Sequence, residues 1–157
     1  MSVTFQLKKI FVIHSEEDDY IIQELKNHFT EQTYGYTKFI IDYLDSRRGL
    51  SLGEDFGKKI MKLIDDADYI FIIITRFSKI SVWVNQEIGY VFGKNKRHFC
   101  MVENKFIGEG LGFIHSNIDI QSFKYGSFDI TKIRYKLEEI HGEEIVPEIG
   151  KVESYVF

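Results

Sequence analysis

One acidic residue, Glu87, stands in the sequence where a side chain can do chemistry. At helical period, Trp83, Glu87 and Tyr90 fall along one stripe, beside an apolar face that includes Val84 and Val91. A carboxylate between two aromatic rings at the edge of a core loses hydration. Such a carboxylate can accept hydrogen bonds and stabilise a developing positive charge, and the indole can stack on a flat ring. The alternative is a solvated glutamate on an ordinary amphipathic helix, and the helix alone slightly favours that alternative.

The same predicted helix contains Gly89, which lowers helix stability by roughly 1 kcal/mol relative to alanine. Close packing against another segment would explain this glycine, and so would room for a ligand. Gly93 and the basic residues from Lys94 onward are typical of a helix C-terminus. The sequence therefore places Glu87 inside a helix that follows a loop at residues 76–81.

Length and composition indicate one globular domain. The chain has 157 residues, of which 44% are hydrophobic and 28% are charged, an ordinary balance for a chain that can bury a core. We expect a single domain over residues 1–157, with its core at about residues 8–140 and a C-terminal extension at residues 141–157. No internal repeat or linker suggests a second domain.

The charge pattern argues against nucleic acid and membranes as partners. The net charge is −4, and the basic residues are scattered without a long run. The longest apolar run, residues 69–75, is too short to span a bilayer, and the N-terminus lacks a signal-peptide pattern. The single cysteine, Cys100, excludes an internal disulfide framework, so we expect a cytoplasmic location. No metal site is expected, because the acidic residues at 65–68 bracket a helix end and lack histidine partners.

Buried strands alternate with amphipathic helices along the chain. Ser15 and Asp18 fit a capping box at the start of the first helix, and Ser127 is the expected start of the last. The alternation predicts an α/β domain: a three-layer, flavodoxin-like, five-stranded parallel sheet of order 2-1-3-4-5 with helices on both faces. The expected strands are residues 10–13, 38–42, 69–75, 99–102 and, less regular, 117–123.

In such a sheet, the ligand crevice lies beyond the carboxyl ends of the strands. The loops expected at that edge are residues 14–18, 43–53, 76–81 and 103–110. The topology therefore predicts one rim that gathers His14, Ser15, the loop arginines Arg47 and Arg48, Phe77, Trp83 and Glu87.

Three segments, in order, resemble the Toll/interleukin-receptor (TIR) domains of bacteria, and the resemblance covers roughly residues 1–140. Residues 11–18 resemble the family's first box, a strand that ends in His-Ser before an acidic helix start. Residues 48–56 resemble the loop after the second strand, although Gly49 and Leu52 replace the usual acid and proline. Residues 81–87 resemble the Trp-x-x-x-Glu segment that carries the family's catalytic glutamate.

The resemblance implies cleavage of NAD⁺ between nicotinamide and ribose, with Glu87 as the catalytic carboxylate. The nicotinamide is already cationic and leaves as a neutral ring, so the reaction needs no general acid. NAD⁺ is the substrate, and no separate cofactor or metal is expected. Attack by water gives ADP-ribose, whereas attack from within the same substrate gives a cyclic ADP-ribose. The expected substrate-binding residues are His14, Ser15, Arg48, Phe77 and Trp83.

The resemblance also implies a setting: self-association through TIR–TIR contacts, a role in bacterial antiphage defence, and a separate effector protein that responds to the nucleotide product. Two other functions stay open. One is a non-catalytic TIR scaffold that assembles through residues 43–53. The other is an enzyme similar to nucleoside deoxyribosyltransferases, which also place a glutamate ahead of a Gly-Tyr helix segment.

Overall fold

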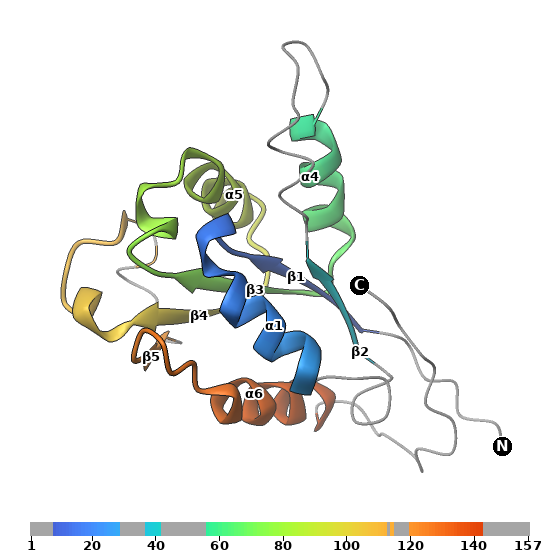
Figure 1. Ribbon diagram of the computed structural model, residues 1–157. Helices are drawn as coiled ribbons and strands as arrows, with labels where there is room; N and C mark the ends of the chain where they lie inside the picture. The colour runs from blue at the N-terminus through green and yellow to red at the C-terminus, as the bar shows by residue number, and fades with distance from the viewer. Residues whose placement is uncertain (1–7, 29–36, 42–55, 113, 115–119, 143–157) are drawn as a thin grey trace, which may run out of the picture.

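The computed structural model of the chain describes residues 8–28, 37–41, 56–112, 114 and 120–142 (Figure 1). The described part alternates strands with helices, and all four strand pairings are parallel, in the order β2-β1-β3-β4-β5. This is the predicted α/β class with the predicted strand order. The strands are β1 (Lys8–Ile13), β2 (Thr37–Ile41), β3 (Tyr69–Ile74), β4 (His98–Glu103) and β5 (Ile120–Phe123). The helices are α1 (Asp19–His28), α4 (Phe56–Asp66), α5 (Val82–Gly93) and α6 (Ile130–Gly142), with short 3-10 turns η1 (Glu16–Asp18), η2 (Ser78–Ile80) and η3 (Asn104–Phe106).

Strand β3 is the central strand of the sheet, and it is covered on both faces. All six of its residues are buried, as its continuous apolar run predicts. Alternate side chains enter two different cores: Phe71 and Ile73 pack toward α1 and α6, whereas Ile72 and Ile74 pack toward α4 and α5. The helices accordingly lie on both faces of the sheet, which gives the three layers (Figure 1).

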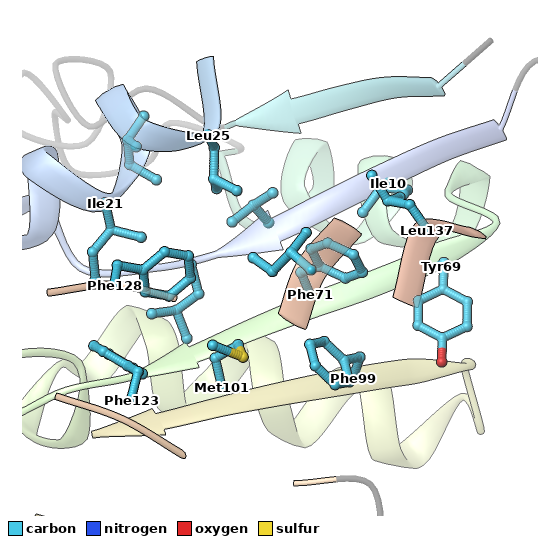
Figure 2. Packing of buried hydrophobic residues seen from close by; sticks show 14 of the residues in the cluster. Ile10, Ile21, Leu25, Tyr69, Phe71, Phe99, Met101, Phe123, Phe128 and Leu137 are labelled. Atoms are coloured by element: carbon cyan, nitrogen blue, oxygen red, sulfur yellow. The ribbon is translucent and has the colours of Figure 1, made fainter. Parts of the chain in front are cut away.

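The core beneath α1 and α6 is rich in aromatic rings (Figure 2). Phe71 and Phe99 meet edge to face with ring centroids 5.6 Å apart, and Phe123 meets Phe128 in the same way at 4.9 Å. These contacts connect β3, β4 and β5 to the segment that leads into α6. The aromatic content of the sequence is thus used, in this core, to fill the space between sheet and helices.

The last helix does not begin where the sequence suggested. Ser127 lies in a turn, where its backbone N–H donates to the carbonyl of Lys124 at 2.9 Å and Gly126 adopts a φ of +86°. Helix α6 begins at Ile130, and the carboxylate of Asp129 accepts a hydrogen bond from the N–H of Thr131 at 3.1 Å. Ser127 is therefore part of the turn, and Asp129 accepts the hydrogen bond at the start of α6.

The surroundings of Gly89 in helix α5 bear on the two explanations of this glycine, close packing and room for a ligand. A Cβ atom added at this glycine would meet no atom within 4 Å outside its own neighbours and helix backbone. Close packing therefore does not require a glycine here.

Replacing Gly89 by alanine is expected to raise the free energy of unfolding by roughly 0.5–1 kcal/mol, because alanine is the better helix former and the site has space. Urea unfolding measures the change. Gly108→Ala is the matched control: its Cβ would also enter open space, but φ is +90°, so alanine is strained there and stability should fall. A loss of stability in Gly89→Ala would contradict the account of this helix.

Candidate active site

Glu87 is buried in the structure, with a relative exposure of 3%. Helix α5 is held at its start by Ser81, whose hydroxyl accepts a hydrogen bond from the N–H of Val84 at 3.3 Å. Val84 and Val91 are fully buried on the face that meets the sheet, and Glu87 lies at the edge of that face. Glu87 is therefore not a solvated surface glutamate, which was the alternative expected for this residue.

The stripe of α5 that carries Glu87 contacts helix α4 through one of its aromatic residues. Tyr90, on the same stripe, donates from its hydroxyl to the carboxylate of Asp65 in α4 at 2.8 Å. Trp83, one turn before Glu87, is half-buried and packs against the core between the sheet, α4 and α5. Both aromatic residues of the stripe thus contact other parts of the fold, and Trp83 has a packing role whether or not it also contacts a ligand.

His14 and Ser15 follow β1 and are buried, with exposures of 3% and 7%. The His14 Nδ1 atom lies 3.0 Å from the carbonyl oxygen of Ser15, and the Ser15 hydroxyl accepts from the N–H of Glu17 at 3.3 Å. Strand β1 pairs with β3, and α5 packs against β1. The loop of His14 and Ser15 and the helix of Glu87 therefore belong to neighbouring elements, as the topology predicts.

The two remaining predicted site residues are Arg48 and Phe77. Arg48, with Arg47 and the rest of the loop at residues 43–53, lies outside the described residues. Phe77 is described, and its ring lies 6.0 Å from that of Tyr125, which in turn contacts Tyr20 of α1. Phe77 therefore lies toward α1 and the segment that follows β5. A substrate contact from Phe77 stays a prediction.

The same edge of the sheet contains a buried polar network around Asp18, which sequence reasoning assigned only to a helix cap. Ser15 does cap η1, but the Asp18 carboxylate does not reach back to it. Because η1 is a 3-10 turn, the N–H of Asp18 meets the carbonyl of Ser15 at 3.1 Å. The Asp18 side chain instead accepts hydrogen bonds from the hydroxyls of Thr75 at 2.6 Å and Tyr125 at 3.3 Å.

Burial sets the ionisation of Asp18. The side chain is 0% exposed, and this loss of hydration raises its pKa to about 6 although hydrogen bonds from Thr75 and Tyr125 act to lower it. The charges of Glu103 and Glu17 add to the rise. Burial, followed by the charge of Asp18, also raises the pKa of Tyr125, to about 12.

Glu103, at the end of β4, has the opposite shift. It is 1% exposed, and burial alone would raise its pKa, but hydrogen bonds from Arg76 lower the pKa below its usual value. Arg76 donates to this carboxylate from its backbone N–H at 2.8 Å and from Nε and Nη2 at 3.2 and 2.5 Å. Its guanidinium also lies 4.4 Å from the ring centroid of Tyr125. The only sign of these residues in the sequence was their position, directly after or at the end of a buried strand.

Within the described residues, no group of three or more His, Cys, Asp or Glu side chains is arranged to hold a metal ion. Acidic residues at the end of α4 and just after it make protein contacts: Asp65 accepts from Tyr90, and Asp68 accepts from the N–H of Lys9 at 2.8 Å. In the same described part of the chain, no helix has the length and apolar character needed to cross a membrane.

Comparisons with known proteins agree with this fold. A family model described as "TIR domain" matches residues 10–124. The structure is similar to the crystal structure of a prokaryotic SEFIR domain, with 16% sequence identity, a TM-score of 0.54, and coverage of 85% of this chain and 97% of that chain. At that identity the likeness concerns the fold. Comparison with curated proteins gives no significant match.

The raised pKa of Asp18 predicts how stability depends on pH. The folded protein holds this proton up to about pH 6, whereas the unfolded chain releases it near the ordinary aspartate pKa of 3.8. Between these values the native state binds more protons, so the contribution of Asp18 to stability falls as pH rises from about 4 to 6, by about 3 kcal/mol at most.

Asp18→Asn should remove this part of the pH dependence. The unfolding free energy of the variant should therefore rise relative to that of wild type as the pH increases from 4 to 6. Urea unfolding at several pH values measures the difference. Asp19→Asn, the exposed neighbour at the start of α1, controls for loss of a charge at the helix N-terminus. Parallel curves for wild type and Asp18→Asn would show that Asp18 titrates normally.

Proposed function

The chain belongs to the TIR domain family, and from this membership and the burial of Glu87 we propose that it is an enzyme that cleaves the nicotinamide–ribose bond of NAD⁺. The product is ADP-ribose or a cyclic ADP-ribose. TIR domains include NAD⁺-cleaving enzymes, and the Trp83–Glu87 spacing matches the segment that carries their glutamate. The observation that supports the proposal most is the 3% exposure of Glu87 on a helix stripe shared with two aromatic residues.

The chemistry suits a single carboxylate. When the bond between C1′ and the pyridinium nitrogen breaks, both electrons go to nitrogen, so nicotinamide leaves neutral and positive charge develops on the ribose. A carboxylate at the ribose stabilises that charge and accepts hydrogen bonds from the ribose hydroxyls. Glu87 supplies this role in the proposal. Water that attacks C1′ gives ADP-ribose, whereas attack by a second nucleophile within the same substrate closes a cyclic product. Either reaction releases one proton overall.

Other residues are proposed to bind the substrate. Trp83, one helical turn before Glu87, presents an indole on which a flat ring of NAD⁺ can stack. His14 and Ser15, buried on the neighbouring β1–α1 connection, are proposed to contact ribose and phosphate. Arg48 and Phe77 complete the proposed set. His14 orients its loop in this scheme, because the reaction requires no base at that position.

TIR domains commonly self-associate, and we propose that this chain does so as part of its activity. The proposed setting is bacterial antiphage defence, with a separate effector protein that responds to the nucleotide product.

A second candidate, a non-catalytic TIR scaffold, is favoured by one observation. Ile80 at the end of η2 is 80% exposed, Val82 at the start of α5 is 69% exposed, and Ile107 after η3 is 49% exposed. Large exposed apolar side chains suit contact with another protein. Self-association without release of nicotinamide at any protein concentration would favour the scaffold over the enzyme.

Glu87→Gln is expected to reduce NAD⁺ cleavage by about 100-fold or more, because the amide cannot neutralise the cationic ribose. The purified protein is incubated with NAD⁺ at rising protein concentrations, and free nicotinamide is followed by chromatography. Mass spectrometry of the products distinguishes the linear product from the cyclic one.

The matched control is Glu138→Gln, the same change at an exposed position of α6. It should leave turnover unchanged, and thermal unfolding of Glu87→Gln should stay close to that of wild type. Unchanged turnover in Glu87→Gln refutes the catalytic role of this residue.

A further inference from the structure

Three connections of the fold meet at Asp18, beyond the carboxyl ends of the strands. Asp18 itself lies between β1 and α1, Thr75 lies between β3 and α5, and Tyr125 lies between β5 and α6. Asp18, Thr75 and Ser78 are all 0% exposed. The hydrogen bonds between them therefore form away from water, where directional contacts fix geometry most strongly.

The Thr75 hydroxyl has one hydrogen, and the structure shows where it goes. It donates to the Asp18 carboxylate at 2.6 Å. The oxygen then accepts from two backbone groups, the N–H of Phe77 at 3.1 Å and the N–H of Ser78 at 3.2 Å. Because an ionised Asp18 only accepts hydrogen bonds, it orients the hydroxyl so that the oxygen lone pairs face these two N–H groups.

Those two N–H groups begin the segment that leads to the proposed catalytic helix. The Ser78 hydroxyl accepts from the N–H of Thr75 at 2.5 Å, and η2 follows directly. Ser81 ends η2, with its N–H donating to the carbonyl of Ser78 at 3.1 Å, and its side chain then caps α5. The start of α5 is thus fixed by a chain of hydrogen bonds that leads back to Asp18.

Asp18 also holds the opposite side of the site. Its backbone N–H donates to the carbonyl of Ser15 at 3.1 Å, and the same carbonyl lies 3.0 Å from Nδ1 of His14. We propose that Asp18 is a positioning residue of the Glu87 site, which holds the start of α5 in register with the loop of His14 and Ser15 through the Thr75 hydroxyl. This inference rests on the proposed function, and it assigns Asp18 no contact with substrate.

The test uses Thr75, because its hydroxyl can be removed at nearly constant volume. In Thr75→Val the methyl groups stay and the donor to Asp18 is lost, along with the acceptor for Phe77 and Ser78. In Thr75→Ser the hydroxyl is retained. Ile133→Val, a small cut in the core beneath α6, is the control for a general loss of stability.

We expect kcat for nicotinamide release to fall about 10- to 100-fold in Thr75→Val, with a smaller change in KM, because the start of α5 is displaced relative to bound substrate. Thr75→Ser should restore kcat to within about threefold of wild type, and Ile133→Val should leave kcat unchanged. Amide hydrogen exchange should become faster in Thr75→Val over residues 76–88 and 14–18, relative to Ile133→Val.

The exchange measurement separates the two proposals. If wild type releases no nicotinamide, the proposed function fails, and exchange alone decides whether Thr75 and Asp18 connect the two segments. Exchange at residues 76–88 that is equal in Thr75→Val and Ile133→Val overturns the positioning role, and so does an unchanged kcat in folded Thr75→Val. If Thr75→Val does not fold, Asp18→Ala, which removes the acceptor of the Thr75 hydroxyl, takes its place in both measurements with the same criteria.

Discussion

The burial of β3 on both faces is the constraint from which the site follows. A strand covered by two layers ends inside protein, so the polar groups that follow it must find partners there and not in water. Thr75, the first residue after β3, does so with Asp18 from the β1–α1 connection, and the backbone N–H of Arg76, the next residue, does so with Glu103 at the end of β4. The parallel order of the sheet brings these connections together, because neighbouring strands all end at the same edge.

In the described part of the chain, three buried carboxylates lie on elements around this edge, and each has a different environment. Arg76 holds Glu103 ionised and lowers its pKa, whereas burial raises the pKa of Asp18 and the hydrogen bonds from two neutral hydroxyls do not offset that rise. Such divergence often marks acid–base catalysis. Here both groups are almost inaccessible and bind other parts of the fold, so they suit support of the site better than contact with substrate. Glu87 of α5 is the third, with an exposure of 3%.

The elements of the fold were predictable where hydrophobic period and burial decide the structure. The continuous apolar run of β3 and the alternation of strands with helices predict the sheet, and the spacing of Trp83, Glu87 and Tyr90 predicts one helical stripe. The sequence also predicts a cap at Ser15, but not that Asp18 would turn away from it. That outcome depends on a 3-10 turn and on two partners 57 and 107 residues away along the chain, which no local pattern contains.

The placement of Phe77 also depends on a partner that is distant along the chain. Topology puts the residue at the correct edge of the sheet, but the side on which its ring packs is set by contact with Tyr125, a residue from the far end of the domain. Arguments from strand order predict which loops meet, because the backbone decides that. They do not predict which side chains face one another within the meeting loops, because packing between distant segments decides that.

Helix α5 carries two residues that packing alone does not explain. Glu87 is a buried carboxylate, and even a well-paired buried charge contributes little net stability compared with an apolar residue of similar size. Gly89 occupies open space in the same helix, so an alanine would fit and would favour the helix. A helix with only a structural role has no need of either residue. Since both lie within one turn of each other, and Trp83 lies one turn before, the physical case for a site on α5 does not depend on the family resemblance alone.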